Sequence, residues 1–155
     1  MMKNTVVPEE KLSSYIMKSN RLNISDFKSQ TRIALLSNFT LDGLIETIKV
    51  KCGELKVGCY TFYGGYNQYN EEILNNKSKL YSFSPDICFL ILDIRNILGD
   101  LFYSPYNLSV EKRKEFIQNK VDELVDLAKS FIEKSNSKLV ISNFIIPTYS
   151  PYGIF

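Results

Sequence analysis

Nine residues that directly follow apolar segments of the sequence could form a binding site. Each of those segments predicts a strand of a parallel sheet, and open parallel sheets bind ligands at the carboxyl ends of their strands. Arg95 is the residue expected to hold an anionic group, because a guanidinium pairs with carboxylate or phosphate in bidentate geometry. We therefore expect a polar, ligand-binding rim made of Ser37, Asn38, Thr40, Gly64, Gly65, Asn67, Gln68, Asp93 and Arg95.

Structural roles for the same residues stay open at this point. Thr40 suits the N-cap of a following helix, and Asp93 with Arg95 would form an ion pair that only fixes a loop. Gly64 and Gly65 would either let the backbone approach a bound group closely or supply a turn with positive φ.

The sequence contains no histidine, which excludes the usual hydrolase centres. A Ser-His-Asp or Cys-His hydrolase needs an imidazole as its general base near neutral pH. Ser37 is the only candidate nucleophile for an atypical centre. The spacing of Cys52, Cys59 and Cys88 matches no zinc pattern, so we expect no metal site and three reduced, buried thiols. No glycine-rich phosphate loop is present either.

The apolar pattern predicts strands that alternate with helices. Unbroken apolar runs, of which residues 87–92 are the clearest, are typical of strands buried on both faces of a parallel sheet. We expect helices at about 12–17, 40–53, 67–74 and 110–134, and strands at 32–37, 55–60, 87–92 and 138–143. This order predicts an α/β fold: a three-layer sandwich in which helices flank a small parallel sheet.

Several boundaries depend on single residues. Thr40 should begin the second helix and Gly53 should end it as a C′ glycine, while Ser109 should cap the long helix. Residues 18–30, 62–69 and 96–109 are expected to be loops. The long helix should bury one stripe of apolar side chains, made of Ile117, Val121, Leu124, Ala128, Phe131 and Ile132.

Length and composition are those of a globular domain. The chain has 155 residues, of which 45% are hydrophobic and 23% charged, enough to bury a core of its own. Nineteen Lys and Arg against 17 Asp and Glu give a net charge of +2, which argues against nucleic acid or a membrane surface as partner. No apolar run approaches the roughly 20 residues that cross a bilayer. With no signal-peptide pattern at the start, we expect a cytoplasmic protein.

Parts of the sequence resemble a known family. The similar stretches are residues 32–42 (RIALLSNFTLD), 66–74 (YNQYNEEIL) and 78–86 (SKLYSFSPD), followed by a strand that ends in Asp93-Ile94-Arg95. Their order and spacing, over about residues 32–146, are similar to those of FkbH-like proteins, subfamily IIIC of the haloacid dehalogenase (HAD) superfamily. Those proteins have an N-terminal domain that looks like the SGNH-hydrolase fold, a flavodoxin-like arrangement, before a phosphatase-like domain.

The resemblance implies a role in glyceryl transfer. FkbH-like proteins take a glyceryl group from a phosphorylated three-carbon acid and load it on an acyl carrier protein, for polyketide or polysaccharide biosynthesis. The Asp-x-Asp-x-Thr motif of the phosphatase is absent here, so Mg²⁺ is expected only in a downstream HAD domain, and no cofactor in this chain. We expect residues 1–31 to form an N-terminal helix and connecting loop, and residues 32–155 an SGNH-like domain cut from a longer protein.

Compared with active SGNH hydrolases, the catalytic residues are replaced. Ser37-Asn38-Phe39 stands where they have Gly-Asp-Ser, Asp93-Ile94-Arg95 replaces their Gly-x-Asn block, and the Asp-x-x-His block has no counterpart. Only Gly64 or Gly65 matches an oxyanion donor. We therefore expect this chain alone to be inactive and to serve as an accessory domain that binds substrate or the carrier protein, with the downstream domain as a partner.

Two other functions stay open. One is an atypical SGNH-type esterase or acyl hydrolase built on Ser37. The other is a protein-interaction module, because tyrosines are enriched at interfaces and four of them cluster in Tyr60, Tyr63, Tyr66 and Tyr69.

Overall fold

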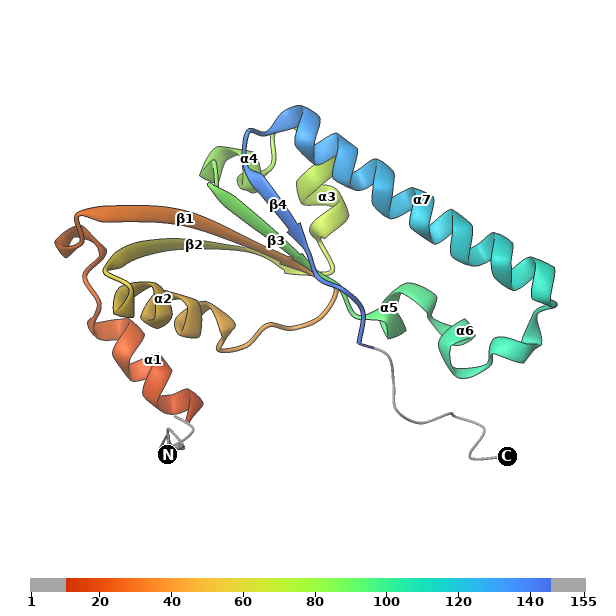
Figure 1. The fold of residues 1–155 in the computed structure, drawn as a ribbon, viewed down its shortest axis with the longest axis horizontal. Helices are drawn as coiled ribbons and strands as arrows, with labels where there is room; N and C mark the ends of the chain where they lie inside the picture. Colours follow the sequence, from red (N-terminus) through yellow and green to blue (C-terminus); the bar gives the residue numbers. More distant parts are fainter. Residues whose placement is uncertain (1–10, 146–155) are drawn as a thin grey trace, which may run out of the picture. The chain divides into compact units, whose positions relative to one another are not determined.

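The computed structural model describes residues 11–145 and has the α/β architecture expected from the sequence (Figure 1). Helices flank one four-stranded parallel sheet, which matches a three-layer sandwich and confirms the predicted fold class. The strands are β1 (Ser29–Ser37), β2 (Val57–Tyr66), β3 (Ile87–Ile91) and β4 (Lys138–Ile141), in the spatial order β2-β1-β3-β4.

The two central strands of the sheet are β1 and β3, and β3 consists of apolar residues alone. β3 pairs in parallel with both β1 and β4, with Leu36 opposite Leu90 and Leu90 opposite Ile141. Strands with sheet neighbours on both sides and helices on the faces read as continuous hydrophobic runs, which explains why the run at residues 87–92 predicted a central position correctly.

The chain divides into two compact units, which are described separately. The first contains residues 11–31 and 41–60, and the second contains residues 32–40 and 61–145. The first unit holds α1 (Leu12–Arg21), a 3₁₀ turn η1 (Ile24–Asp26) and α2 (Leu44–Glu54). In this unit α1 packs on α2, so closely that a Cβ at Gly43 would lie 2.2 Å from Leu12 Cδ1. The expected domain division at residue 31 stays a prediction.

The second unit contains the main hydrophobic core. Its helices are α3 (Tyr69–Leu74), α4 (Lys79–Phe83), α5 (Ile94–Leu98), α6 (Asp100–Tyr103), the 3₁₀ turn η2 (Pro105–Asn107) and α7 (Val110–Lys134). Figure 1 shows α7 beside α3, and the two helices are in contact. Buried side chains from the sheet and these helices form one cluster: Ala34, Leu36, Ile73, Leu80, Cys88, Leu90, Leu92, Leu127 and Phe131.

Both predicted boundaries of α2 are wrong. The helix begins at Leu44, and its N-cap is Gly43, in the left-handed region at φ 78°, whereas Thr40 lies in the exposed connection before it. Gly53 lies inside the helix, which continues to Glu54 and is followed by Lys56 at φ 63°. A cap depends on where the chain must turn to pack, and the residue type alone did not reveal that position.

All three predicted loops contain regular structure. Residues 18–30 include the end of α1, the turn η1 and the start of β1. β2 continues to Tyr66, so most of the tyrosine-rich segment is strand, and residues 94–107 fold into α5, α6 and η2. Of the four tyrosines, Tyr60 and Tyr66 are exposed, while Tyr63 and Tyr69 are half-buried. β2 is the hydrogen-bonded neighbour of β1 at the edge of the sheet, and this backbone pairing stabilises the strand despite its glycines.

The long helix α7 begins and ends where the sequence predicted, and its Ser109 cap is confirmed, since Ser109 Oγ accepts a hydrogen bond from Lys112 N at 3.3 Å. The predicted buried stripe is only partly correct. Phe131 is buried, as is Leu127, which the stripe omitted, but Ile117, Val121 and Ile132 are exposed.

Residues 146–155, which include the proline-rich segment, lie outside the described residues. Among the helices of residues 11–145, none combines the length and the apolar character needed to cross a bilayer.

Candidate functional site

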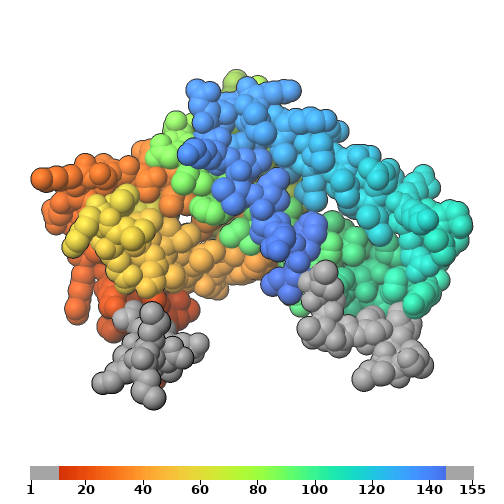
Figure 2. All heavy atoms as spheres, viewed as in Figure 1, coloured from red at the N-terminus to blue at the C-terminus, as the bar shows by residue number. Residues whose placement is uncertain are grey.

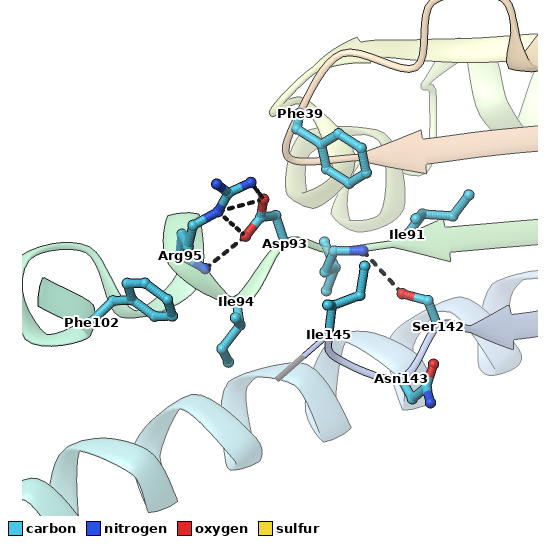
Figure 3. A pocket seen from close by; sticks show the side chains of 10 residues that line it. Phe39, Ile91, Asp93, Ile94, Arg95, Phe102, Ser142, Asn143 and Ile145 are labelled. Atoms are coloured by element: carbon cyan, nitrogen blue, oxygen red, sulfur yellow. Dashed lines mark hydrogen bonds and ion pairs between the residues drawn. The ribbon is translucent and has the colours of Figure 1, made fainter. Parts of the chain in front are cut away.

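A cavity of about 530 Å³ lies at the carboxyl ends of β3 and β4, beside the loop that follows β1 (Figure 3). Small-molecule sites typically have volumes of about 300–1,000 Å³ and occur at this edge of open α/β sheets. Apolar side chains predominate in its lining, which consists of Phe39, Ile91, Leu92, Asp93, Ile94, Arg95, Phe102, Ser142, Asn143 and Ile145.

Asp93 and Arg95 form an ion pair at this cavity (Figure 3). Arg95 Nε lies 3.0 Å from both carboxylate oxygens of Asp93, and Nη2 lies 2.5 Å from Oδ2. The side-chain hydrogen bonds from Arg95 hold the pKa of the Asp93 carboxyl below its ordinary value. Asp93 Oδ1 also accepts from Arg95 N at 2.8 Å and so caps α5. The ion pair between Asp93 and Arg95, which the sequence analysis gave as the structural alternative, is therefore formed.

Asn38 joins the loop after β1 to the loop after β3. Its side-chain Oδ1 accepts from Asp93 N at 2.8 Å, and its Nδ2 donates to Asp93 O at 3.0 Å. Asn96 Nδ2 in turn donates to Asn38 O at 2.8 Å. Asn38 is 2% exposed, and both the Oδ1 and the Nδ2 of its side chain are hydrogen-bonded to Asp93. It therefore positions Asp93 rather than facing the cavity.

Ser37 is fully buried, and its Oγ donates to Phe39 O at 2.5 Å. A nucleophilic serine must reach the substrate and lie within hydrogen-bond reach of a base. In this structure the Ser37 hydroxyl is buried and donates its hydrogen bond to the backbone carbonyl of Phe39. Nothing observed at Ser37 therefore favours the hydrolase hypothesis.

The remaining predicted rim residues lie outside the lining of this cavity. Gly64 packs so closely that a Cβ would lie 2.4 Å from Leu36 Cδ2, and Gly65 has φ 83°. Both glycines therefore have structural explanations, close packing for the first and the turn role for the second. Thr40, Asn67 and Gln68 are exposed. Of the nine predicted residues, Asp93 and Arg95 are brought together at the cavity.

Sequence reasoning missed the apolar part of the site. Phe39, Ile94 and Phe102 come from loops or short helices whose apolar residues resembled ordinary core positions. Ser142 and Asn143 carried a usable signal, because they directly follow β4. Ser142 Oγ accepts from Leu92 N at 3.2 Å, which joins the ends of β3 and β4 among the residues that line the cavity.

This arrangement is suited to binding. Arg95 is the one cation among the described residues of the lining, and Asp93 already neutralises it. Within residues 11–145, no group of three or more His, Cys, Asp or Glu side chains is placed to hold a metal ion.

The three cysteines are free thiols, and their burial differs. Burial raises the pKa of the Cys88 thiol to about 12, and burial together with the neighbouring Cys52 raises that of Cys59 to about 12. Cys52 is only partly buried, so the expectation of three buried cysteines is wrong for that residue.

Comparison with known proteins gives one informative likeness. No family model matches the sequence, and no curated protein matches it. A crystal structure described as the N-terminal part of the protein BF1531 from Bacteroides fragilis, containing a phosphatase domain and complexed with Mg, is similar, with a TM-score of 0.71 and 16% sequence identity. The likeness covers 90% of this chain but 35% of that one. The fold of this chain is thus shared with part of a solved chain that is described as containing a phosphatase domain, and the matched region is about a third of that chain's length.

Proposed function

We propose that this chain is a non-catalytic accessory domain that binds the acyl-bearing arm of an acyl carrier protein, within an FkbH-like phosphatase/glyceryltransferase. The supporting observation is the cavity at the ends of β3 and β4, which is largely apolar and contains a guanidinium that is already paired. Glyceryl transfer and its Mg²⁺ would belong to a downstream phosphatase-like domain, and the protein would act in the cytoplasm.

The charge of the cavity favours the carrier-protein arm over the free phosphorylated acid. A phosphorylated three-carbon acid carries several negative charges, whose desolvation must be offset by cations. Among the described lining residues the only cation is Arg95, and its charge is balanced by Asp93. A pantetheine arm is neutral along most of its length, and its amides would pair with polar groups such as Ser142 and Asn143.

A binding experiment tests this proposal. The probe is a purified acyl carrier protein with its phosphopantetheine arm, and the same protein without the arm is the control ligand. We expect binding that depends on the arm. Phe102→Ala should raise the dissociation constant about fivefold to tenfold, because the arm loses its contact with an aromatic side chain that lines the cavity. Phe116→Ala, a half-buried position on α7 outside the cavity lining, should leave it unchanged.

Substitution of Arg95 distinguishes binding of the carrier-protein arm from binding of an anionic ligand. If the arm is bound, Arg95→Ala should weaken binding less than Phe102→Ala does, at nearly unchanged melting temperature. A larger effect of Arg95→Ala would indicate recognition of a phosphate or carboxylate instead. Equal binding of the two forms of the carrier protein, or no binding of either at millimolar concentration, would rule the proposal out.

A further inference from the structure

The outer face of α7 carries an apolar stripe that the core does not use. Five β-branched side chains on this helix are between 43% and 63% exposed, and we call them the Val121 stripe: Val110, Ile117, Val121, Val125 and Ile132. Figure 1 shows the N-terminal half of α7 extending past the carboxyl end of β4, and Figure 2 shows the atoms of α7, cyan to blue, at the surface. A row of exposed apolar side chains along one helix face is typical of interaction sites.

The stripe is distinct from the face that packs on the core. The buried residues of α7 are Leu127 and Phe131. At 100° per residue, Phe131 projects about 80° away from Val121 around the helix, whereas all five stripe residues fall within about 40° of Val121. The stripe therefore forms a second, narrower apolar face beside the buried one, as in helices that pair with another helix.

The stripe reads almost the same in both directions from Val121. Ile117 and Val125 lie four residues before and after it, and Val110 and Ile132 lie eleven residues before and after it. If two copies of α7 pack antiparallel about a two-fold axis at Val121, Val110 meets Ile132 of the second copy and Ile117 meets Val125. A self-complementary surface is what a two-fold symmetric dimer requires.

The non-stripe residues in the same seam fit this arrangement. Lys114 and Ala128 lie seven residues before and after Val121, within the angular range of the stripe. In antiparallel packing the aliphatic stem of each lysine lies over the small alanine of the second copy, with its charge at the edge. Parallel packing would instead place the two Lys114 side chains opposite one another, which like charges disfavour.

The charges beside the stripe are complementary in the same register. Glu111 and Lys129 are eighteen residues apart, or five full turns, so they share the exposed flank turned away from the core. Antiparallel packing brings Glu111 of each copy near Lys129 of the other. We propose that this protein forms a two-fold symmetric dimer through the Val121 stripe, with its α7 helices antiparallel.

The oligomeric state of the chain, followed by sedimentation velocity from about 1 to 200 µM, tests the proposal. We expect a monomer–dimer equilibrium in which Val121→Lys raises the dissociation constant at least about tenfold, because it puts two like charges at the two-fold axis. Asn119→Lys adds the same charge on the opposite, exposed face of α7 and should leave dimerisation intact. A chain that is monomeric throughout, or a dimer that Val121→Lys does not weaken, overturns the proposal.

Charge exchange tests the register. Glu111→Lys should weaken the dimer, and adding Lys129→Glu to the same chain should restore it, since both ion pairs are then rebuilt with reversed polarity. Val121→Cys, in a Cys52→Ser background, should form an intermolecular disulfide under mild oxidation, whereas Asn119→Cys in that background should not. Failure of the double variant to recover, or equal cross-linking of the two cysteine variants, overturns the antiparallel register.

Discussion

The Asn38 side chain should be one of the most sensitive polar positions in this protein. Asn38→Ala removes the hydrogen bond that Asp93 N donates to Oδ1 and the one that Nδ2 donates to Asp93 O. Both partners are backbone groups at the end of β3, and the side chain that holds them is 2% exposed. The substitution therefore leaves a donor and an acceptor of Asp93 without these partners.

The size of the effect follows from those two bonds. A net loss of about 1 kcal/mol per hydrogen bond, plus part of the desolvation cost of the abandoned backbone groups, amounts to about 2–4 kcal/mol in the free energy of unfolding. For a chain of 155 residues, 1 kcal/mol shifts the melting temperature by about 2–4 °C. We therefore expect Asn38→Ala to lower the melting temperature by about 5–15 °C.

Urea unfolding at equilibrium, followed by circular dichroism, measures the change against two matched variants. Asn96→Ala removes the single hydrogen bond to Asn38 O from an exposed residue and should cost about 1 kcal/mol or less. Asn143→Ala alters an exposed asparagine after β4 and should change the unfolding free energy by less than about 0.5 kcal/mol. The expected order of destabilisation is Asn38, then Asn96, then Asn143.

The result that would refute this reasoning is an Asn38→Ala protein as stable as Asn143→Ala. Water would then replace the amide at no cost, and the two loops would not depend on Asn38. If the substitution destabilises as expected, the folded fraction should also bind the carrier-protein arm more weakly, because Asp93 and Arg95 are then no longer held beside the cavity.

Three further predictions concern the core and the titrating groups. The Cys88 thiol, with its pKa raised to about 12, stays protonated at pH 8 and buried, so Cys88→Ser should leave the number of thiols that react with Ellman's reagent unchanged in the native protein and lower it by one in urea. Because the folded-state pKa of Asp93 is depressed, its pairing with Arg95 stabilises the protein above the unfolded pKa of about 3.9 and is lost as pH falls through the lower folded value. Arg95→Ala should thus cost at most about 1 kcal/mol at pH 7, since Arg95 is 57% exposed, and nothing in stronger acid, as urea titrations at several pH values would show. Phe131→Ala should cost about 3–5 kcal/mol, because Phe131 is fully buried, whereas Phe144→Ala, 37% exposed, should cost far less in the same assay.

The fold could be predicted from the sequence where the apolar pattern of a segment matches the surroundings of that segment in the folded protein. The apolar run at residues 87–92 has one suitable place, the centre of a parallel sheet, and β3 occupies it. The 25-residue α7 was also predicted at its full length, because its periodicity is long and Ser109 is a strong cap. The absence of histidine likewise excluded whole classes of chemistry through residue type alone.

Other features depend on contacts between distant parts of the chain. Thr40 is a good capping residue, but the helix is capped by Gly43, which lies against Leu12 of α1 and whose φ of 78° favours glycine. Ile117 and Leu127 share one helix, and only the packing of α7 on α3 and β4 decides that the first is exposed and the second buried.

The candidate site, like the fold, could be predicted from the sequence only in part. Its general position, at the carboxyl ends of the strands, follows from sequence order, because parallel strands all end at one edge of the sheet. Which polar groups face a ligand does not follow, since Asn38 and Asp93 are 55 residues apart and satisfy each other's hydrogen bonds only after folding. A polar residue beyond a strand could bind a ligand or fix a loop, and only the tertiary structure, by supplying or withholding partners, decided between these roles.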